Sequence, residues 1–325
     1  MPKISVLLPV YNAKAFIAES IQSILDQTEP DFELLIVDDC STDGSIEIID
    51  SFKDPRIIFH KKKRNSGYTE SLNWAIDQAK GEYIARMDAD DVSLPNRFEK
   101  QLKFLMFNPD ISICGTDAFV RGGNLIFNYP QTPKAIFANL LMGNSLIHPS
   151  IFGRSEIFKK FKYDRSKEPA EDYDLFTRLV IENKRLANIP EKLLIYRLHS
   201  EQTSEVRKIK QIQSAKRSML QLFKYFNYDQ DLYPDSLVSN AIWPERVFLR
   251  PELIQAIKWY ASLNSLKKNL DIDHSYLNFV LKRKRYNLLK FCLKHGNSRD
   301  YGYNFYVWAQ LFRLSPKMFV KGLLN

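Results

Sequence analysis

Short apolar runs alternate with segments of helical periodicity through the first ninety residues. Residues 3–9 (KISVLLP) and 32–37 (FELLIV) are nearly continuous apolar runs, typical of strands that are buried on both faces. Residues 13–27 and 69–79 instead carry apolar side chains at helical spacing. Strands that alternate with helices in this way predict an α/β fold, with a mostly parallel sheet and helices on both faces.

Polar and acidic residues come directly after several of these predicted strands. Residues 9–12 (PVYN) end the first strand, Asp38-Asp39 end the second, and residues 88–91 (DADD) follow an apolar strand at residues 82–87. Ligands of open α/β sheets bind at the carboxyl ends of the strands. We therefore predict a ligand site built from these three segments.

The acidic run at residues 88–91 is the candidate metal site. Asp88, Asp90 and Asp91 would repel one another unless a cation or water screened their charges. Mg²⁺ and Mn²⁺ take oxygen ligands and commonly bridge carboxylates to phosphate oxygens. A solvated, Asp-rich turn is the alternative interpretation, and the position directly after a buried strand favours the metal site.

Four other residues are candidates whose patterns also have structural interpretations. Asp39 could accept a hydrogen bond from a uracil nitrogen or a ribose hydroxyl, yet DDCSTDG at residues 38–44 is also a loop sequence. Glu171 and Asp172 open a predicted helix, where acidic residues complement the helix dipole and where a general base would stay ionised. His199 follows a predicted strand, and a lone histidine is more often structural than catalytic.

Together these segments resemble glycosyltransferase family 2, in the order in which that family carries them. The matching segments are residues 4–12 (ISVLLPVYN), 36–44 (IVDDCSTDG), 65–67 (NSG), 81–91 (GEYIARMDADD), 170–179 (AEDYDLFTRL) and 196–199 (YRLH). The resemblance implies a GT-A fold and a nucleotide-diphospho-sugar donor, with a UDP-sugar expected. It also implies a divalent Mn²⁺ or Mg²⁺ ion and an inverting single displacement.

The resemblance also assigns the nucleotide pocket. By likeness to the family, Pro9, Tyr11 and Asp39 should line the base and ribose pocket, with Asn65 and Gly67 on the adjoining loop.

The remaining site residues follow from the same resemblance. Asp88 and Asp90 match the DxD positions, with Asp90 as the direct metal ligand and Asp88 shared with the ribose. Asp91 is expected to support the site or to face the donor sugar. Asp172 matches the catalytic base and Glu171 should lie near the acceptor. His199 should contact the metal or the diphosphate.

Processive relatives carry a Gln-x-x-Arg-Trp signature and transmembrane helices. Residues 310–314 (QLFRL) lack the tryptophan, and no run of about 18 apolar residues is present. The resemblance therefore implies a non-processive enzyme that adds one sugar to a saccharide acceptor. An acceptor carried on a polyprenyl diphosphate, in O-antigen or capsule assembly, is the pathway that the family suggests.

The two parts of the chain differ in charge, which predicts two regions. From residue 205 onward there are 21 Lys and Arg against 9 Asp and Glu, and the βα alternation ends. We predict a catalytic domain at residues 1–204 and a basic, aromatic-rich, largely helical region at residues 205–325. That region either contacts an anionic membrane or only packs as a small helical domain. Nucleic-acid binding is not expected, because no recognised module is present.

Scattered cysteines and the missing leader predict a cytoplasmic protein, either free or peripheral at the inner face of the cell membrane. A hairpin is also expected at residues 111–127, around Gly122-Gly123. Two rival functions remain open. A sugar nucleotidyltransferase would show a Gly-rich N-terminal loop, whereas this chain has PVYN there. A non-catalytic nucleotide-sugar-binding protein on the same scaffold is the other alternative.

Overall fold

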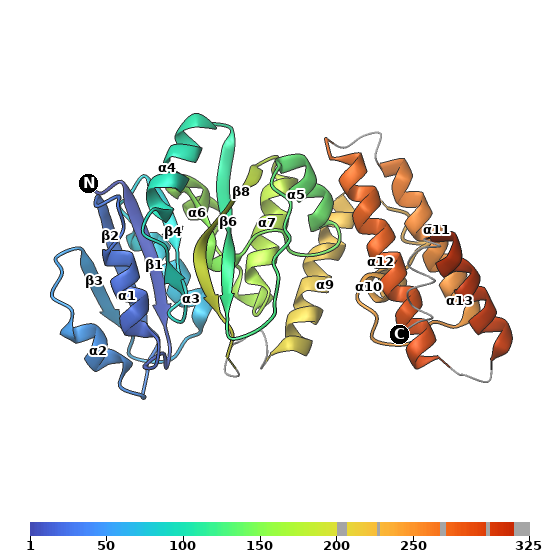
Figure 1. Ribbon diagram of the computed structural model, residues 1–325, viewed down its shortest axis with the longest axis horizontal. Coiled ribbons are helices and arrows are strands. Elements are labelled where there is room, and N and C mark those ends of the chain that lie inside the picture. The colour runs from blue at the N-terminus through green and yellow to red at the C-terminus, as the bar shows by residue number, and fades with distance from the viewer. Residues whose placement is uncertain (200–206, 226–227, 267–270, 297–299, 315–325) are drawn as a thin grey trace. The chain divides into compact units, whose positions relative to one another are not determined.

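The computed structural model describes residues 1–199, 207–225, 228–266, 271–296 and 300–314. The chain forms two compact units (Figure 1). The first comprises residues 1–136 and 144–215, and the second comprises residues 137–143 and 216–325. The domain boundary predicted after residue 204 lies outside the described residues.

The first unit is built on an eight-stranded sheet with the order β3-β2-β1-β4-β7-β6-β8-β5. The strands are β1 (Ile4–Val10), β2 (Phe32–Asp38), β3 (Ile57–Lys61), β4 (Tyr83–Arg86), β5 (Val92–Ser93), β6 (Ile111–Arg121), β7 (Phe152–Arg154) and β8 (Arg185–Arg197). Strands β3, β2, β1 and β4 are parallel to one another, and β6 is parallel to β8. β7 is antiparallel to its neighbours β4 and β6, and β5 is antiparallel to β8. The predicted α/β class is confirmed, with a sheet that is mixed beyond β4.

Helices cover both faces of this sheet (Figure 1). They are α1 (Ile17–Leu25), α2 (Ser45–Ser51), α3 (Tyr68–Gln78), α4 (Arg97–Phe107), α6 (Ser155–Phe161) and α7 (Glu171–Ile181), with 3₁₀ turns at His148–Ser150 and Arg165–Lys167. Every residue of β1 and β2 is buried, as the continuous apolar runs predicted. On α1, Ile17, Ile21 and Ile24 are fully buried because their spacing places them on one helical face.

The predicted hairpin at residues 111–127 is wrong. β6 pairs in parallel with β8 along its length, from Ile111 opposite Arg185 to Arg121 opposite Arg197. Residues 124–130 carry no strand and follow a turn in which Gly122 has a φ of +94°. β8 occupies one edge of β6 along its whole length, and the chain after Gly122-Gly123 does not pair with β6 as a strand.

The second unit is helical, as predicted for the C-terminal region. Its helices are α10 (Asp235–Ile242), α11 (Arg250–Leu266), α12 (His274–His295) and α13 (Tyr301–Leu314), while α5 (Pro133–Leu140) and α9 (Lys208–Tyr225) each begin in the first unit and end in the second. Trp259, Phe223 and Phe248 are fully buried in it, and the rings of Phe223 and Trp259 are in edge-on contact. Over the described ranges, no helix combines the length and the apolar character needed to cross a membrane.

Candidate active site

A cavity of about 650 Å³ opens in the first unit at the carboxyl ends of β1, β2 and β4. All of the site residues expected from the sequence line it, except Asp91. The residues concerned are Pro9, Tyr11, Asp39, Asn65, Gly67, Asp88, Asp90, Glu171, Asp172 and His199. Parallel strands end at the same edge of a sheet, which is why segments up to 190 residues apart converge here.

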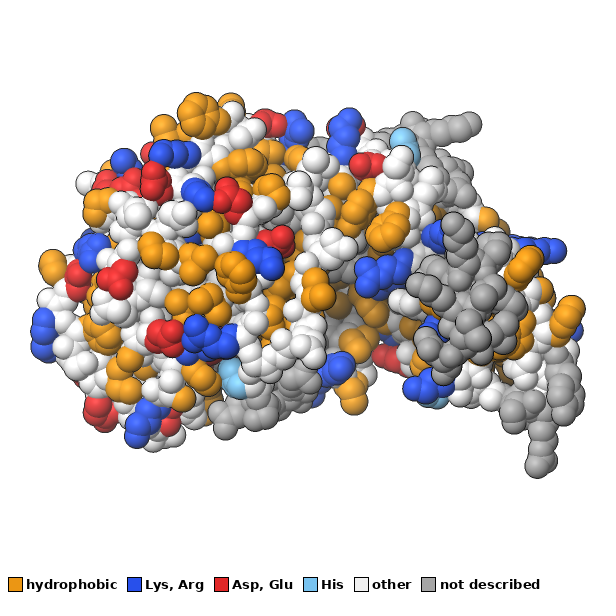
Figure 2. All heavy atoms as spheres, viewed as in Figure 1, with side chains coloured by type: hydrophobic (Ala, Val, Ile, Leu, Met, Phe, Trp, Pro, Cys, Tyr) orange, Lys and Arg blue, Asp and Glu red, His pale blue; other side chains and the backbone are white. Residues whose placement is uncertain are grey.

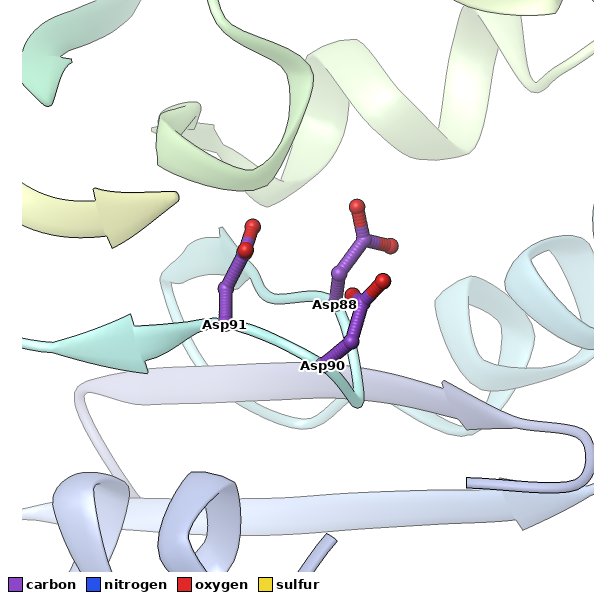
Figure 3. A group of neighbouring side chains, drawn as sticks. All are labelled: Asp88, Asp90 and Asp91. Atoms are coloured by element: carbon purple, nitrogen blue, oxygen red, sulfur yellow. The ribbon is translucent and has the colours of Figure 1, made fainter. Parts of the chain in front are cut away.

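The acidic loop after β4 gathers three carboxylates at this edge (Figure 3). Asp88, Asp90 and Asp91 each offer an oxygen that lies within 4.8 Å of the other two. The guanidinium of Arg86 bonds Asp88 Oδ1, and the hydroxyl of Tyr68 donates to the same oxygen at 3.2 Å. Burial raises the pKa of Asp88 to about 6, against the lowering effect of Arg86, and the charge of Asp90 adds to the rise.

Asp90 and His199 lie side by side in the wall of the cavity. Nε2 of His199 lies 2.9 Å from Oδ2 of Asp90, and the imidazole packs against the ring of Phe16 at a centroid distance of 4.8 Å. Asp90 is about a quarter exposed, so its carboxylate is open to a ligand. Asp88 and Asp90 thus place two carboxylates at one cavity. Such a pair suits a hard divalent cation, whose remaining coordination positions are filled by phosphate oxygens and water.

Asp91 lies behind the cavity wall instead of on it. Its side chain is fully buried, and Oδ1 accepts a hydrogen bond from the backbone N–H of Arg197 at 3.0 Å. Its backbone carbonyl accepts from the hydroxyl of Ser20 on α1. Burial, followed by repulsion from Asp88 and Asp90, raises the pKa of Asp91 well above its ordinary value. Of the two roles expected for Asp91, this position fits the supporting one.

Asp39 fixes the loop that forms the adjoining wall. Its two carboxylate oxygens accept the backbone N–H groups of Ser66 and Gly67, each at 2.9 Å. The ammonium of Lys62 lies 2.8 Å from Oδ1, and both side chains of this pair are largely buried. Gly67 has a φ of +98°, a conformation that other residues rarely adopt. Asp39 therefore shapes the predicted nucleotide pocket as well as lining it.

Replacing Asp39 with asparagine should lower the free energy of unfolding by about 3 kcal/mol, because it leaves the buried ammonium of Lys62 without its counter-ion. Urea titration measures this difference. Asp50→Asn is a matched control, since it breaks the exposed ion pair between Asp50 and Lys61, the residue that precedes Lys62. That change should cost about 0.5 kcal/mol or less. Equal losses for the two variants would show that Asp39 does not hold its loop.

Glu171 and Asp172 open α7 and differ in their surroundings. Glu171 is 7% exposed, and its Oε2 has no hydrogen-bond partner within the described part of the chain. Burial, then repulsion from Asp172, raises the pKa of Glu171 to about 8, so this carboxyl is protonated near neutral pH. Oδ2 of Asp172 accepts the side-chain amide of Asn144, and Oδ1 accepts the backbone N–H of Tyr173, both at 2.7 Å.

The pKa of Asp172 is raised by burial, and the hydrogen bonds from Tyr173 and Asn144 oppose that rise. The two carboxyl groups therefore differ in their surroundings: hydrogen-bond donors favour the ionised form of Asp172, whereas Oε2 of Glu171 has no donor within the described residues. α7 itself is anchored by Arg178, which bonds Asp174 at 2.7 Å and the carbonyls of Phe161 and Lys162. This anchoring fixes the direction of the acidic end of α7.

Sequence reasoning missed several residues of the cavity wall. Arg86 is 2% exposed, bonds Asp88, and its charge also acts on Glu171 and Asp172 at the start of α7. A charged residue within an apolar strand was the available signal. His148 also lines the cavity and bonds the hydroxyl of Tyr163 at 2.9 Å. Asn144 and Arg207 also line the cavity.

Residues 5–173, more than half of the chain, match the model of the family described as Glycosyl transferase family 2. This chain belongs to glycosyltransferase family 2. The family predicted from the sequence is therefore confirmed.

Curated relatives carry related names. An uncharacterized glycosyltransferase of Methanocaldococcus jannaschii is 37% identical over 210 residues, which cover 61% of this chain and 71% of the relative. The O-antigen biosynthesis glycosyltransferase WbnJ of Escherichia coli is 34% identical over 213 residues, which cover 62% of this chain and 82% of WbnJ.

Solved structures of the same fold match most of the chain. TarS 1–349 of S. aureus, in complex with UDP-GlcNAc, superposes with a TM-score of 0.56 at 15% identity, covering 90% of this chain and 92% of that one. The mannosyltransferase PcManGT from Pyrobaculum calidifontis, in complex with GDP-Man and Mn²⁺, gives a TM-score of 0.55 at 15% identity and 87% coverage of both chains. The GT-A fold expected from the sequence is confirmed.

Proposed function

We propose that this glycosyltransferase moves one sugar from a UDP-sugar to a hydroxyl of a saccharide acceptor, with inversion at the anomeric carbon. The observation that carries the proposal is the meeting of three parts in one cavity. They are the acidic loop with Asp88 and Asp90, the loop held by Asp39, and the carboxylate of Asp172. The structurally similar TarS binds UDP-GlcNAc, which supports a uridine nucleotide as the donor.

The donor half of the cavity combines carboxylates with an open aromatic ring. Tyr11 is 56% exposed and can stack on a base, next to the loop of Asn65 and Gly67. Asp90 and Asp88 would hold Mn²⁺ or Mg²⁺, and the Mn²⁺ in PcManGT supports a metal of this kind. When bound, such an ion stabilises the negative charge that grows on the leaving diphosphate. His199, bonded to Asp90, would orient that carboxylate.

The acceptor half uses the two carboxyl groups of α7 in different ways. Asp172 takes the proton of the acceptor hydroxyl as its oxygen forms a bond to the anomeric carbon. The bond from that carbon to the diphosphate oxygen breaks, and UDP leaves with the electron pair. Glu171, protonated near neutral pH, donates a hydrogen bond to another acceptor oxygen.

A panel of donors tests the proposed function directly. UDP-glucose, UDP-galactose, their N-acetyl forms, and dTDP- and GDP-sugars are compared by metal-dependent thermal shift and by nucleotide release. We expect a UDP-sugar to give the largest shift, and UDP to be released only with Mn²⁺ or Mg²⁺ present. Release of pyrophosphate would instead indicate a nucleotidyltransferase. Tight binding without turnover on any acceptor would indicate a binding protein.

We further propose that the acceptor belongs to cell-surface polysaccharide assembly and is carried on a polyprenyl diphosphate, so that the enzyme works at an anionic membrane. The O-antigen name of WbnJ supports the pathway. On the face in Figure 2, acidic and basic side chains are interspersed over the first unit, whereas Lys and Arg outnumber acidic groups over the described helices of the second. Neither α12 nor α13 contains a single Asp or Glu.

The exposed face of α12 is suited to a lipid headgroup layer. Phe279 is 54% exposed, and Lys282, Arg283 and Lys290 are exposed on the same side of the helix. On α13, Phe305 is 77% exposed. Aromatic side chains can enter the headgroup layer while the cations meet anionic lipid.

Replacing Lys282 and Arg283 together with glutamine should weaken vesicle binding about 30-fold, because each cation near an anionic surface contributes about 1 kcal/mol. Co-sedimentation with phosphatidylglycerol vesicles measures the change. The matched control replaces Lys100 and Lys103, two lysines on α4 that pair with Glu191 and Glu99, and it should bind as wild type does. Equal losses in both double variants, or equal wild-type binding to neutral phosphatidylcholine, would contradict membrane contact by α12.

A further inference from the structure

Asn144 is the side chain that holds the carboxylate of Asp172. Its Nδ2 donates to Oδ2 of Asp172 at 2.7 Å, and both residues line the cavity. The other oxygen of Asp172 accepts the backbone N–H of Tyr173. Each oxygen thus has a donor among the described residues, and these two hydrogen bonds orient the carboxylate.

The amide of Asn144 is itself held in one orientation. Its Oδ1 accepts the backbone N–H of Ser145 at 2.7 Å. That contact requires the oxygen of the amide to face the loop, so the NH₂ group faces Asp172. The loop is anchored in turn by Asn188 of β8, whose side chain donates to the carbonyl of Ser145 at 2.8 Å and to that of Pro130 at 2.7 Å.

We propose that Asn144 is a positioning residue for the base: it fixes the carboxylate of Asp172 toward the acceptor and favours its ionised form. This inference rests on the proposed function, because it assigns Asn144 a role in the same transfer. An amide can donate to Asp172 only through its NH₂ group, and that hydrogen bond stabilises the charged carboxylate. Asn144 therefore acts through Asp172 and does not touch the reacting atoms.

Other charged and titratable groups also face Asp172. Those whose charges interact with it are Arg86 on β4, Asp88 on the acidic loop, Tyr129 on the loop after β6, Tyr163 after α6, and Glu171 on α7. Arg86 favours the ionised form of Asp172, and the charge of Asp172 in turn raises the pKa of Asp88 and of Glu171. Asn144 differs from all of these because it is neutral at every pH, so its contribution is a hydrogen bond of fixed geometry.

The test replaces Asn144 with alanine and with aspartate in the full-length protein. For Asn144→Ala we expect kcat to fall about 10²-fold, the size of effect that misplacing a reacting group produces. The KM for the UDP-sugar should stay within about twofold. The acid limb of the pH–kcat profile should move to higher pH, because the donor that favours the ionised base is gone. Asn144→Asp should lose more activity, since it sets a second carboxylate against Asp172.

Ser145→Ala is the matched control. It removes the hydroxyl by which this loop donates to the carbonyl of Ile136 on α5, and leaves the amide of Asn144 in place. A purely structural role for the loop would make Ser145→Ala and Asn144→Ala alike in kcat, with an unmoved pH profile in both, and that result would overturn the proposal. Thermal unfolding and UDP binding verify that each variant is folded.

A second readout separates this inference from the proposed function. The titration of the Asp172 carboxyl carbon, followed by ¹³C NMR with Asp172→Asn for assignment, needs no turnover. We expect the pKa of Asp172 to be higher in Asn144→Ala than in wild type. A wild-type protein without transferase activity would refute the proposed function, whereas an unchanged pKa and kcat in Asn144→Ala would refute the role of Asn144.

Discussion

Replacing Asp172 with asparagine is expected to lower kcat by about 10²–10⁴-fold, the contribution of a positioned general base. The amide cannot take the proton of the acceptor hydroxyl, yet it keeps the size of the side chain. Binding of UDP with Mn²⁺ should be unchanged, because the residues expected to bind the donor lie on the loops after β1, β2, β3 and β4 and not on α7. Steady-state transfer assays and calorimetric titration of UDP measure the two quantities.

The pH dependence of the wild-type enzyme belongs to the same prediction. Burial raises the pKa of Asp172, and a base works only when it is deprotonated. Activity should therefore fall as the pH decreases through that raised pKa, at a higher pH than an exposed aspartate would give. Asp172→Asn should lose this acid limb. Near-normal turnover in Asp172→Asn, with wild-type pH dependence, would show that another group is the base.

Replacing Asp90 with asparagine should remove metal-dependent donor binding. A neutral amide is a much weaker ligand for a hard divalent cation than a carboxylate, and the Asp90 carboxylate is about a quarter exposed in the cavity wall. We expect affinity for the UDP-sugar in Mn²⁺ to fall at least 10-fold and kcat about 10³-fold. Electron paramagnetic resonance of free Mn²⁺ gives metal binding independently of turnover.

The control for this variant is Asp77→Asn, a change of the same chemistry at a half-exposed carboxylate that pairs with Lys162 on the surface. It should leave metal affinity and transfer unchanged. The assignment of Asp90 fails when Asp90→Asn binds Mn²⁺ as tightly as wild type, or when metal chelation leaves wild-type transfer intact.

The position of the cavity was predictable because it depends on strand order. Three apolar runs, each followed at once by polar residues, had to become neighbouring parallel strands, and β2, β1 and β4 do lie side by side. Tyr11, Asp39 and Asp90 therefore share one edge. Helix α7 was predictable from its apolar spacing, although the distance between its acidic end and the edge was not.

The contacts within the cavity could not be predicted, because they depend on loops. Asn144 lies in a loop, where the sequence has no helical or strand periodicity to indicate which way a side chain points. Its contact with Asp172 depends on the conformation of that loop. Asp39 shows the same limit, since its place in the pocket followed from the strand whereas its two backbone hydrogen bonds to the loop after β3 did not. The failed hairpin after Gly122 has a related cause: pairing of β6 was decided by β8, over sixty residues later.

The partition of the chain has a consequence for recombination between family members. The backbone passes between the two units after residues 136, 143 and 215, so the helical unit is not a cassette attached at one point. Residues 137–143 contribute Leu140, Leu141 and Met142, which are at most 1% exposed, to that unit. If only the C-terminal part were exchanged between relatives, these three side chains would pack against helices from another protein. Each one left exposed to water would lower the free energy of unfolding by about 1.5–3 kcal/mol. Functional chimeras should therefore carry residues 137–143 and the C-terminal helices together from one parent.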